Sequence, residues 1–220
     1  TKAGKRALCL GGAKNHIIIV PDADKDSTAK GLLGSSMGSA GQRCMAASVA
    51  IGVADIDPII DQLIVETESF QLGEDMGTIV SKQALGRITN YINEAVAMGA
   101  ELLVDGRNIT PPAEYRDGYW LGPTILDGVD PDWSCAKEEI FGPVLSLIRV
   151  DTIEAALEIE NNNQYGNAAA VFTTSGQIAQ TISEHASAGM VGVNIGVPVP
   201  REPYSFGGWN ESKYGHGDIT

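Results

Sequence analysis

The stretch Ile17-Ile18-Ile19-Val20-Pro21-Asp22-Ala23-Asp24 decides how this 220-residue chain folds. Four consecutive β-branched apolar residues predict a buried strand, and Pro21 ends it. Asp22 and Asp24 are N-cap residues for a helix that we expect to continue to about Ser36. A buried strand followed at once by a helix is the repeating unit of a parallel sheet, so this stretch already favours an α/β fold.

The same alternation continues along the chain. We expect further strands at 46–53, 101–105, 119–126, 144–150, 168–174 and 190–195. We expect helices that open at Asp57-Pro58 and that cover 81–98, 152–160 and 175–185, with a surface loop at 107–118. The helix over 81–98 is the clearest, because its apolar residues follow the 3.6-residue period and Gly99 ends it. The predicted fold is a three-layer α/β domain with a mostly parallel sheet flanked by helices.

Composition and charge exclude several classes of function. The net charge is −13 and the pI is near 4.5, which disfavours nucleic acid as a partner. The apolar runs are far shorter than the roughly 20 residues that span a bilayer, so we expect no membrane partner. An anionic substrate would be repelled by the overall charge and would need a local cationic anchor.

The cysteines are few and odd in number: Cys9, Cys44 and Cys135. Such a count argues against a disulfide framework and for a reducing compartment, such as the bacterial cytoplasm or the mitochondrial matrix. No Cys-x-x-Cys or His-x-x-x-His spacing occurs, so we expect no metal site.

Cys44 follows a stretch that is rich in Gly, Ala and Ser and stands directly after Arg43. Small residues leave room for a ligand, and a positive charge nearby favours the thiolate form of a nucleophilic cysteine. From local chemistry alone, the alternative is that Cys44 is a small buried hydrophobe in the sheet.

Four motifs, taken together, resemble the aldehyde dehydrogenase superfamily. Gly41-Gln42-Arg43-Cys44 is similar to its Gly-Gln-x-Cys nucleophile motif, and the segment 10–15 (Leu-Gly-Gly-Ala-Lys-Asn) to its upstream Glu-Leu-Gly-Gly-Lys segment. The segment 138–144 (Glu-Glu-Ile-Phe-Gly-Pro-Val) matches the family's Glu-Glu-x-Phe-Gly-Pro-Val, and Phe206-Gly207-Gly208 with 212–215 resembles its closing motif. The motifs stand in the family's order and span almost the whole chain.

Finer features resemble the methylmalonate-semialdehyde dehydrogenase branch: segments 10–16 and 41–46, and Val193-Asn194 followed by 198–200. That branch uses NAD and coenzyme A. It converts malonate semialdehyde and methylmalonate semialdehyde to acetyl-CoA and propionyl-CoA with loss of carbon dioxide. The resemblance therefore implies a semialdehyde carboxylate as the small-molecule substrate.

The resemblance assigns a role to each candidate residue. Cys44 is the catalytic nucleophile, Glu139 accepts hydrogen bonds from the nicotinamide ribose, and Phe141 packs near that ribose. Arg43 stands beside the nucleophile, where a guanidinium could bind the substrate carboxylate. Alternatives stay open: Arg43 could form a surface or interdomain salt bridge, and Glu139 could be an ordinary turn charge.

The sequence departs from the family at Cys9. Hydrolytic members place a glutamate before the Leu-Gly-Gly segment, where it activates water, and Cys9 cannot act in this way. The departure favours transfer of the acyl group to coenzyme A. In the alternative interpretation Cys9 is only a core residue. A hydrolytic enzyme with an unusual base, and a non-catalytic module with the same fold, are the competing functions.

The resemblance also implies a division of the chain. Residues 1–15 would end the dinucleotide-binding domain or form a lead-in strand, 16–196 would form the catalytic domain, and 197–220 would lead back to the NAD-binding and oligomerisation part. The remaining dinucleotide-binding domain of the same chain is then a partner, and the full-length protein would be a dimer or tetramer. We expect the 220 residues alone to be inactive.

Overall fold

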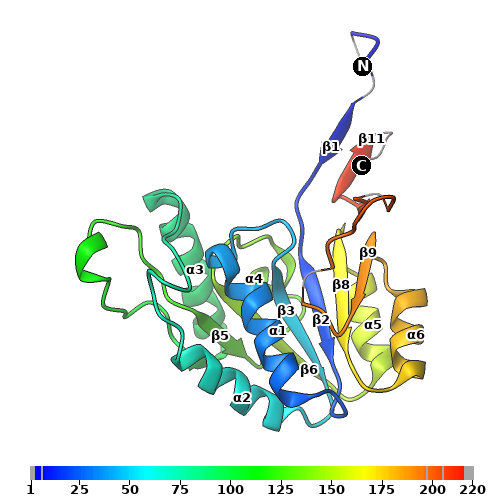
Figure 1. Cartoon of the computed structure of the whole chain (residues 1–220), viewed down its shortest axis with the longest axis horizontal. Coiled ribbons are helices and arrows are strands. Elements are labelled where there is room, and N and C mark those ends of the chain that lie inside the picture. The colour runs from blue at the N-terminus through cyan, green and yellow to red at the C-terminus, as the bar shows by residue number, and fades with distance from the viewer. Residues whose placement is uncertain (1–2, 6, 197, 205, 216–220) are drawn as a thin grey trace.

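A seven-stranded sheet forms the centre of the protein in the computed structural model, which describes residues 3–5, 7–196, 198–204 and 206–215 (Figure 1). The strand order is β4-β5-β6-β3-β2-β8-β9, and every neighbouring pair is parallel except β4 with β5. The strands are β2 (Asn15–Ile19), β3 (Ala47–Val53), β4 (Glu101–Val104), β5 (Thr124–Asp127), β6 (Val144–Val150), β8 (Ala168–Phe172) and β9 (Met190–Val193). This sheet confirms the predicted fold class.

Helices flank the sheet. They are α1 (Lys25–Met37), α2 (Asp57–Glu68), α3 (Lys82–Met98), α4 (Ser134–Lys137), α5 (Ile153–Asn161) and α6 (Gly176–His185), with 3₁₀ turns η1 (Gly38–Gly41) and η2 (Ala113–Tyr115). Among the described residues, no helix is long and apolar enough to cross a membrane.

The expected helix starts are confirmed by their caps. Asp24, Ser81, Thr152 and Ser175 each accept a hydrogen bond from the backbone N–H three residues later, at the starts of α1, α3, α5 and α6. Each bond satisfies one of the N–H groups that a helix start leaves without a partner. At the other end of α3, Gly99 adopts the left-handed conformation with φ 111°.

Strand β2 lies in the middle of the core. Ile17, Ile18 and Ile19 are each no more than 1% exposed, because both faces of the strand are covered. Strand β8 beside it is buried along its whole length. This explains why the sequence shows continuous apolar runs at these strands and not the alternation of a half-exposed strand.

The structure corrects one predicted strand and adds short elements. Residues 119–126 were expected to form one strand, but β5 begins only at Thr124, and Tyr119 makes an isolated bridge to Ile79. Pro123 lacks a backbone N–H and stands directly before the strand, which explains the late start. Strand β1 (Leu8–Leu10) lies within the segment 1–15, for which a lead-in strand was one interpretation. The helix α4 and three strands were not predicted: β7 (Tyr165–Gly166), β10 (Trp209–Asn210) and β11 (Lys213–Gly215).

Two of these short strands form a ribbon outside the main sheet. β1 pairs with β11 in antiparallel fashion, and the ribbon extends beyond the sheet (Figure 1). Cys9 lies in β1 opposite Tyr214 and is exposed. The interpretation of Cys9 as a core residue is therefore wrong. The predicted division of the chain at 15 and 196 stays a prediction, and residues 197, 205 and 216–220 of its last part lie outside the described residues.

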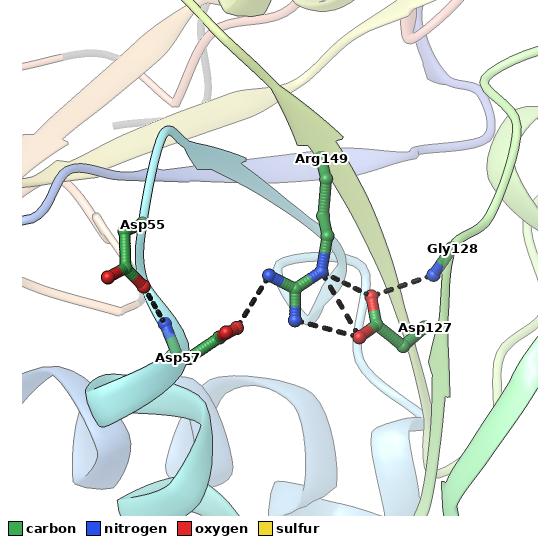
Figure 2. A network of polar contacts seen from close by, with 5 residues as sticks. All are labelled: Asp55, Asp57, Asp127, Gly128 and Arg149. Carbon is green, nitrogen blue, oxygen red and sulfur yellow. Dashed lines mark hydrogen bonds and ion pairs between the residues drawn. The ribbon is translucent and has the colours of Figure 1, made fainter.

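An ionic network connects the carboxyl end of the sheet to a helix (Figure 2). The guanidinium of Arg149, from β6, donates two parallel hydrogen bonds to the Asp127 carboxylate at 3.0 and 2.8 Å, and a third to Asp57 of α2 at 2.7 Å. Asp127 is only 7% exposed and also accepts from the N–H of Gly128 at 2.7 Å. The hydrogen bond to Asp127, with smaller contributions from Asp57, raises the pKa of Arg149.

We expect Arg149→Met to lower the free energy of unfolding by about 1.5–3 kcal/mol, because it leaves the buried Asp127 carboxylate without its charged donor. The matched control is Lys137→Met, which removes the exposed ion pair with Asp132 and should cost less than about 1 kcal/mol. Urea denaturation of both variants measures the difference. Equal losses would mean that the Arg149–Asp127 pair contributes no more to the free energy of unfolding than a surface pair does.

Candidate active site

The predicted site residues come together at the amino ends of the parallel strands. Cys44, Arg43, Glu139 and Phe141 all line one small cavity of about 10 Å³, the space of about a single water molecule. Cys44 stands shortly before β3, and Glu139 and Phe141 shortly before β6. The structure thus joins two motifs that lie 95 positions apart in the sequence.

Cys44 is exposed, whereas Cys135 is 1% exposed. The alternative that Cys44 is a buried hydrophobe is therefore wrong. Burial raises the pKa of the Cys135 thiol, which keeps this residue in its unreactive protonated form. Of these two cysteines, only Cys44 can meet a substrate from solution.

The chain reverses sharply before it reaches Cys44. After α1 ends, Ser39, Ala40 and Gly41 adopt the left-handed conformation in succession, with φ of 54°, 54° and 66°. Left-handed backbone costs about 1–2 kcal/mol for a residue with a Cβ, and such conformations persist only where surrounding contacts hold them. The loop that carries Cys44 must therefore be fixed by its neighbours.

Gly41 makes one of the contacts that hold this loop in place. A Cβ atom at this position would collide with the carbonyl oxygen of Gly142, in the loop that carries Glu139 and Phe141. The backbones of the two motifs touch because a glycine stands here. Gln42 makes further contacts of this kind: its amide donates to the carbonyl of Thr78 at 3.1 Å and accepts from the N–H of Val80 at 2.9 Å.

The backbone of Cys44 is held by two asparagine side chains. Asn15, the first residue of β2, donates to the carbonyl oxygen of Cys44 at 2.8 Å, and Asn167, directly before β8, donates to the same oxygen at 2.9 Å. The sequence analysis assigned no role to Asn167 and used Asn15 only within a motif. Their shared signal is an asparagine at the start of a buried strand or directly before one.

Arg43 contacts the end of α1. Its guanidinium donates to the carbonyls of Gly34 and Ser35 at 2.6 and 2.9 Å. The last turn of α1 contains no basic residue of its own, so Arg43 supplies the positive charge that favours a helix C-terminus. Among the described residues Arg43 makes no ion pair, and its role as a carboxylate anchor stays a prediction.

Glu139 is half-buried at the cavity. One carboxylate oxygen accepts from the N–H of Ala13 at 3.3 Å. Burial raises the pKa of Glu139, while this hydrogen bond and the charges of Arg87 and Lys14 act in the opposite direction. Phe141, two residues later, is 37% exposed and has φ 55°. The cavity wall therefore contains a half-buried carboxylate and, two residues later, an exposed aromatic ring.

Lys14 and His16 have structural roles. The Lys14 ammonium donates to the carbonyl of Cys135 at 2.7 Å, and burial lowers its pKa to about 7. Burial, followed by the charge of Lys14, lowers the pKa of His16 to about 3. His16 is therefore neutral at physiological pH, and neither residue lines the cavity that contains Cys44.

The segment that leads into β2 contains no carboxylate. Residues 1–21 contain neither Asp nor Glu, so the lack of a glutamate does not depend on which of these positions is compared with the family's. Cys9 and Leu10 are both exposed on β1.

We expect Gly41→Ala to destabilise the fold by about 2 kcal/mol or more, because it combines a left-handed alanine with a clash against Gly142. Gly34→Ala is the matched control: a Cβ at Gly34 meets nothing within 4 Å, and alanine in α1 should stabilise by about 0.4–1 kcal/mol. Chemical denaturation reports both changes. If Gly41→Ala were as stable as Gly34→Ala, the close contact between the two loops would not exist in solution.

Comparison with known proteins places these features in a family. The sequence profile described as "Aldehyde dehydrogenase family" matches residues 1–220. A malonate-semialdehyde dehydrogenase from Pseudomonas aeruginosa is 44% identical over 223 residues, which is 98% of this chain and 45% of that protein. One from Bacillus cytotoxicus is 42% identical over 222 residues, with the same coverage. The chain spans less than half the length of these curated relatives.

Solved structures agree with the sequence comparison. A putative methylmalonate-semialdehyde dehydrogenase from Sinorhizobium meliloti, complexed with NAD, superposes with a TM-score of 0.94 at 44% identity, covering 99% of this chain and 46% of that one. A 1-pyrroline-5-carboxylate dehydrogenase from Thermus with bound NAD gives 0.85 at 29% identity, covering 92% and 40%. The thiol and carboxylate motifs, the fold and the sequence profile agree: this chain belongs to the aldehyde dehydrogenase family.

Proposed function

We propose that the full-length protein containing this chain oxidises malonate semialdehyde and methylmalonate semialdehyde with NAD and transfers the acyl group to coenzyme A. The observation that carries the proposal is the cavity that unites Cys44, Arg43 and Glu139, in a chain without any carboxylate in residues 1–21. The names of the relatives at 41–44% identity support the substrate class.

The exposed Cys44 thiolate performs the first step. It attacks the aldehyde carbon and forms a hemithioacetal, whose C–H hydrogen must then leave with its electron pair. NAD, when bound, accepts this hydride. The carbon that remains is a thioester of Cys44. The backbone N–H of Cys44 stabilises the oxyanion that forms during attack.

Glu139 and Phe141 are the residues of this chain that would hold the nicotinamide end of the cofactor. The carboxylate of Glu139 can accept hydrogen bonds from two neighbouring ribose hydroxyls, and the N–H of Ala13 fixes one of its oxygens. The exposed ring of Phe141 offers an apolar surface beside it. These contacts would hold the nicotinamide ribose at the cavity wall that also carries Cys44.

The fate of the thioester follows from the missing carboxylate. Without a base to activate water, hydrolysis is slow, and the thiol of coenzyme A displaces Cys44 from the acyl carbon. The substrate's carboxyl group is β to the thioester carbonyl, so its loss as carbon dioxide leaves an enolate that takes up one proton. The products are acetyl-CoA or propionyl-CoA, carbon dioxide and NADH.

We expect NADH formation by the full-length protein with malonate semialdehyde to depend on coenzyme A, because only an external thiol regenerates Cys44 at each cycle. Steady-state kinetics with and without coenzyme A measure this, with methylmalonate semialdehyde as second substrate. Without coenzyme A we expect one NADH per active site and then a stop. Continued turnover without coenzyme A would favour a hydrolytic dehydrogenase, and absence of any turnover a non-catalytic module.

We expect Arg43→Ala to raise the KM for malonate semialdehyde far more than the KM for propionaldehyde, which has no carboxylate. The physical reason is the loss of the guanidinium that orients the anionic end of the substrate. Arg43→Lys tests the geometry, because an ammonium retains the charge without the planar pair of donors. Equal effects on both aldehydes would leave Arg43 with only its role at the end of α1.

A further inference from the structure

The carbonyl oxygen of Cys44 is an unusual point in the active-site loop, because two side-chain amides converge on it. The Nδ2 atoms of Asn15 and Asn167 lie 2.8 and 2.9 Å from it. One asparagine belongs to the central strand β2 and the other precedes β8, so the two donors come from neighbouring strands of the sheet. Both lone pairs of this carbonyl are therefore occupied.

Both asparagines are themselves fixed. Asn15 also donates to the carbonyl of Ala46 at 2.9 Å, and its oxygen accepts from the N–H of Ala168 at 3.1 Å. Asn167 also contacts the sulfur of Met45 at 3.2 Å. The two residues are 4% and 7% exposed, and a buried amide without a partner costs about 1–3 kcal/mol. Other positions of these side chains are therefore unfavourable.

Asn15 also lies two residues after Ala13, whose backbone N–H fixes Glu139. The N–H of Ala13 donates to the Glu139 carboxylate, and the Lys14 ammonium donates to the Cys135 carbonyl shortly before Glu139. A segment of three residues, 13–15, thus contacts the nucleophile loop on one side and the carboxylate loop on the other. This segment therefore links the two loops, in addition to the direct contact between Gly41 and Gly142.

The nucleophile loop needs such support. Two of its three left-handed residues, Ser39 and Ala40, are strained, and Cys44 itself is exposed. Two donors on one carbonyl fix the plane of the Cys44–Met45 peptide, which restricts the backbone of Cys44 and the direction of its side chain. A displacement of about 1 Å at a reacting group can cost about 100-fold in rate.

We propose that Asn15 and Asn167 are positioning residues for the nucleophile, which hold the Cys44 peptide in the orientation that attack on the aldehyde and hydride removal require. The inference deepens the proposed function, although its structural part does not depend on which aldehyde is oxidised or on what removes the acyl group. The competing interpretation is that the two amides only satisfy strand ends and contribute to stability.

The contact itself is measurable by NMR in the 220-residue chain. Cys44-Met45 is the only Cys-Met pair in the sequence, so carbonyl-¹³C cysteine combined with ¹⁵N methionine gives a single carbonyl–nitrogen correlation. A carbonyl carbon that loses a hydrogen bond resonates at higher field. We expect this shift for Asn167→Leu and for Asn15→Leu. Asn167→Leu keeps the test valid if Asn15→Leu, which also removes the Ala168 contact, does not fold.

The catalytic consequence is measured in the full-length protein with the aldehyde it oxidises fastest. We expect each variant to lower kcat by about 10- to 100-fold with KM within about twofold, because alignment acts on the transition state and not on substrate binding. The matched control is Asn161→Leu. Asn161 donates to the carbonyl of His185 and accepts from the N–H of Ser187, away from the cysteine loop. It should change neither the resonance nor kcat.

Each outcome decides between the interpretations. A shifted resonance with lower kcat and unchanged KM supports the proposal. An unshifted resonance, or a shifted one with unchanged kcat, overturns it, and so does a rise in KM at constant kcat. Turnover that needs no coenzyme A would contradict the proposed function while this inference stands. If turnover depends on coenzyme A but the Asn167→Leu variant keeps its kcat, the proposed function stands and this inference fails.

Discussion

The burial of β2 on both faces is the constraint on which the rest of the structure depends. Three consecutive isoleucines without measurable exposure require a neighbouring strand on each side and helices above and below. β3 and β8 provide the neighbours, in parallel register. Because β2 cannot shift without exposing these side chains, the residues directly before it also have fixed positions, and these are the residues that reach the active site.

Parallel strands begin at one edge of a sheet, and this fact assembles the site. Asn15 begins β2, Cys44 lies just before β3, Phe141 just before β6 and Asn167 just before β8. Many open α/β sheets bind ligands at the carboxyl ends of their strands instead. In this protein the carboxyl edge contains the Arg149 network, which joins β5, β6 and α2 (Figure 2). One edge therefore carries the ionic network and the other carries the candidate active site.

The sequence predicted what depends on local signals, and the motif resemblance identified Cys44 and Glu139. Helix starts followed from residues such as Asp24 and Ser81, because a cap is a contact between residues three positions apart. Contacts across long stretches had no such signal. The two amides on the Cys44 carbonyl come from residues 29 and 123 positions away, and no periodicity reports them. Short strands such as β7 also escaped, since two residues show no alternation.

Under the proposed function, the electrostatics of the site favour Arg43 as the cation that meets the substrate carboxylate. The chain has a net charge of −13, so a carboxylate approaches against the overall field. Lys14 is near the cavity, but burial lowers its pKa to about 7 and its ammonium is occupied by the Cys135 carbonyl. Arg87 donates to the backbone carbonyl of Glu139. An arginine keeps its charge at any physiological pH. Arg43, beside the thiol and braced by the carbonyls of α1, is the cation that combines permanent charge with a place in the cavity wall.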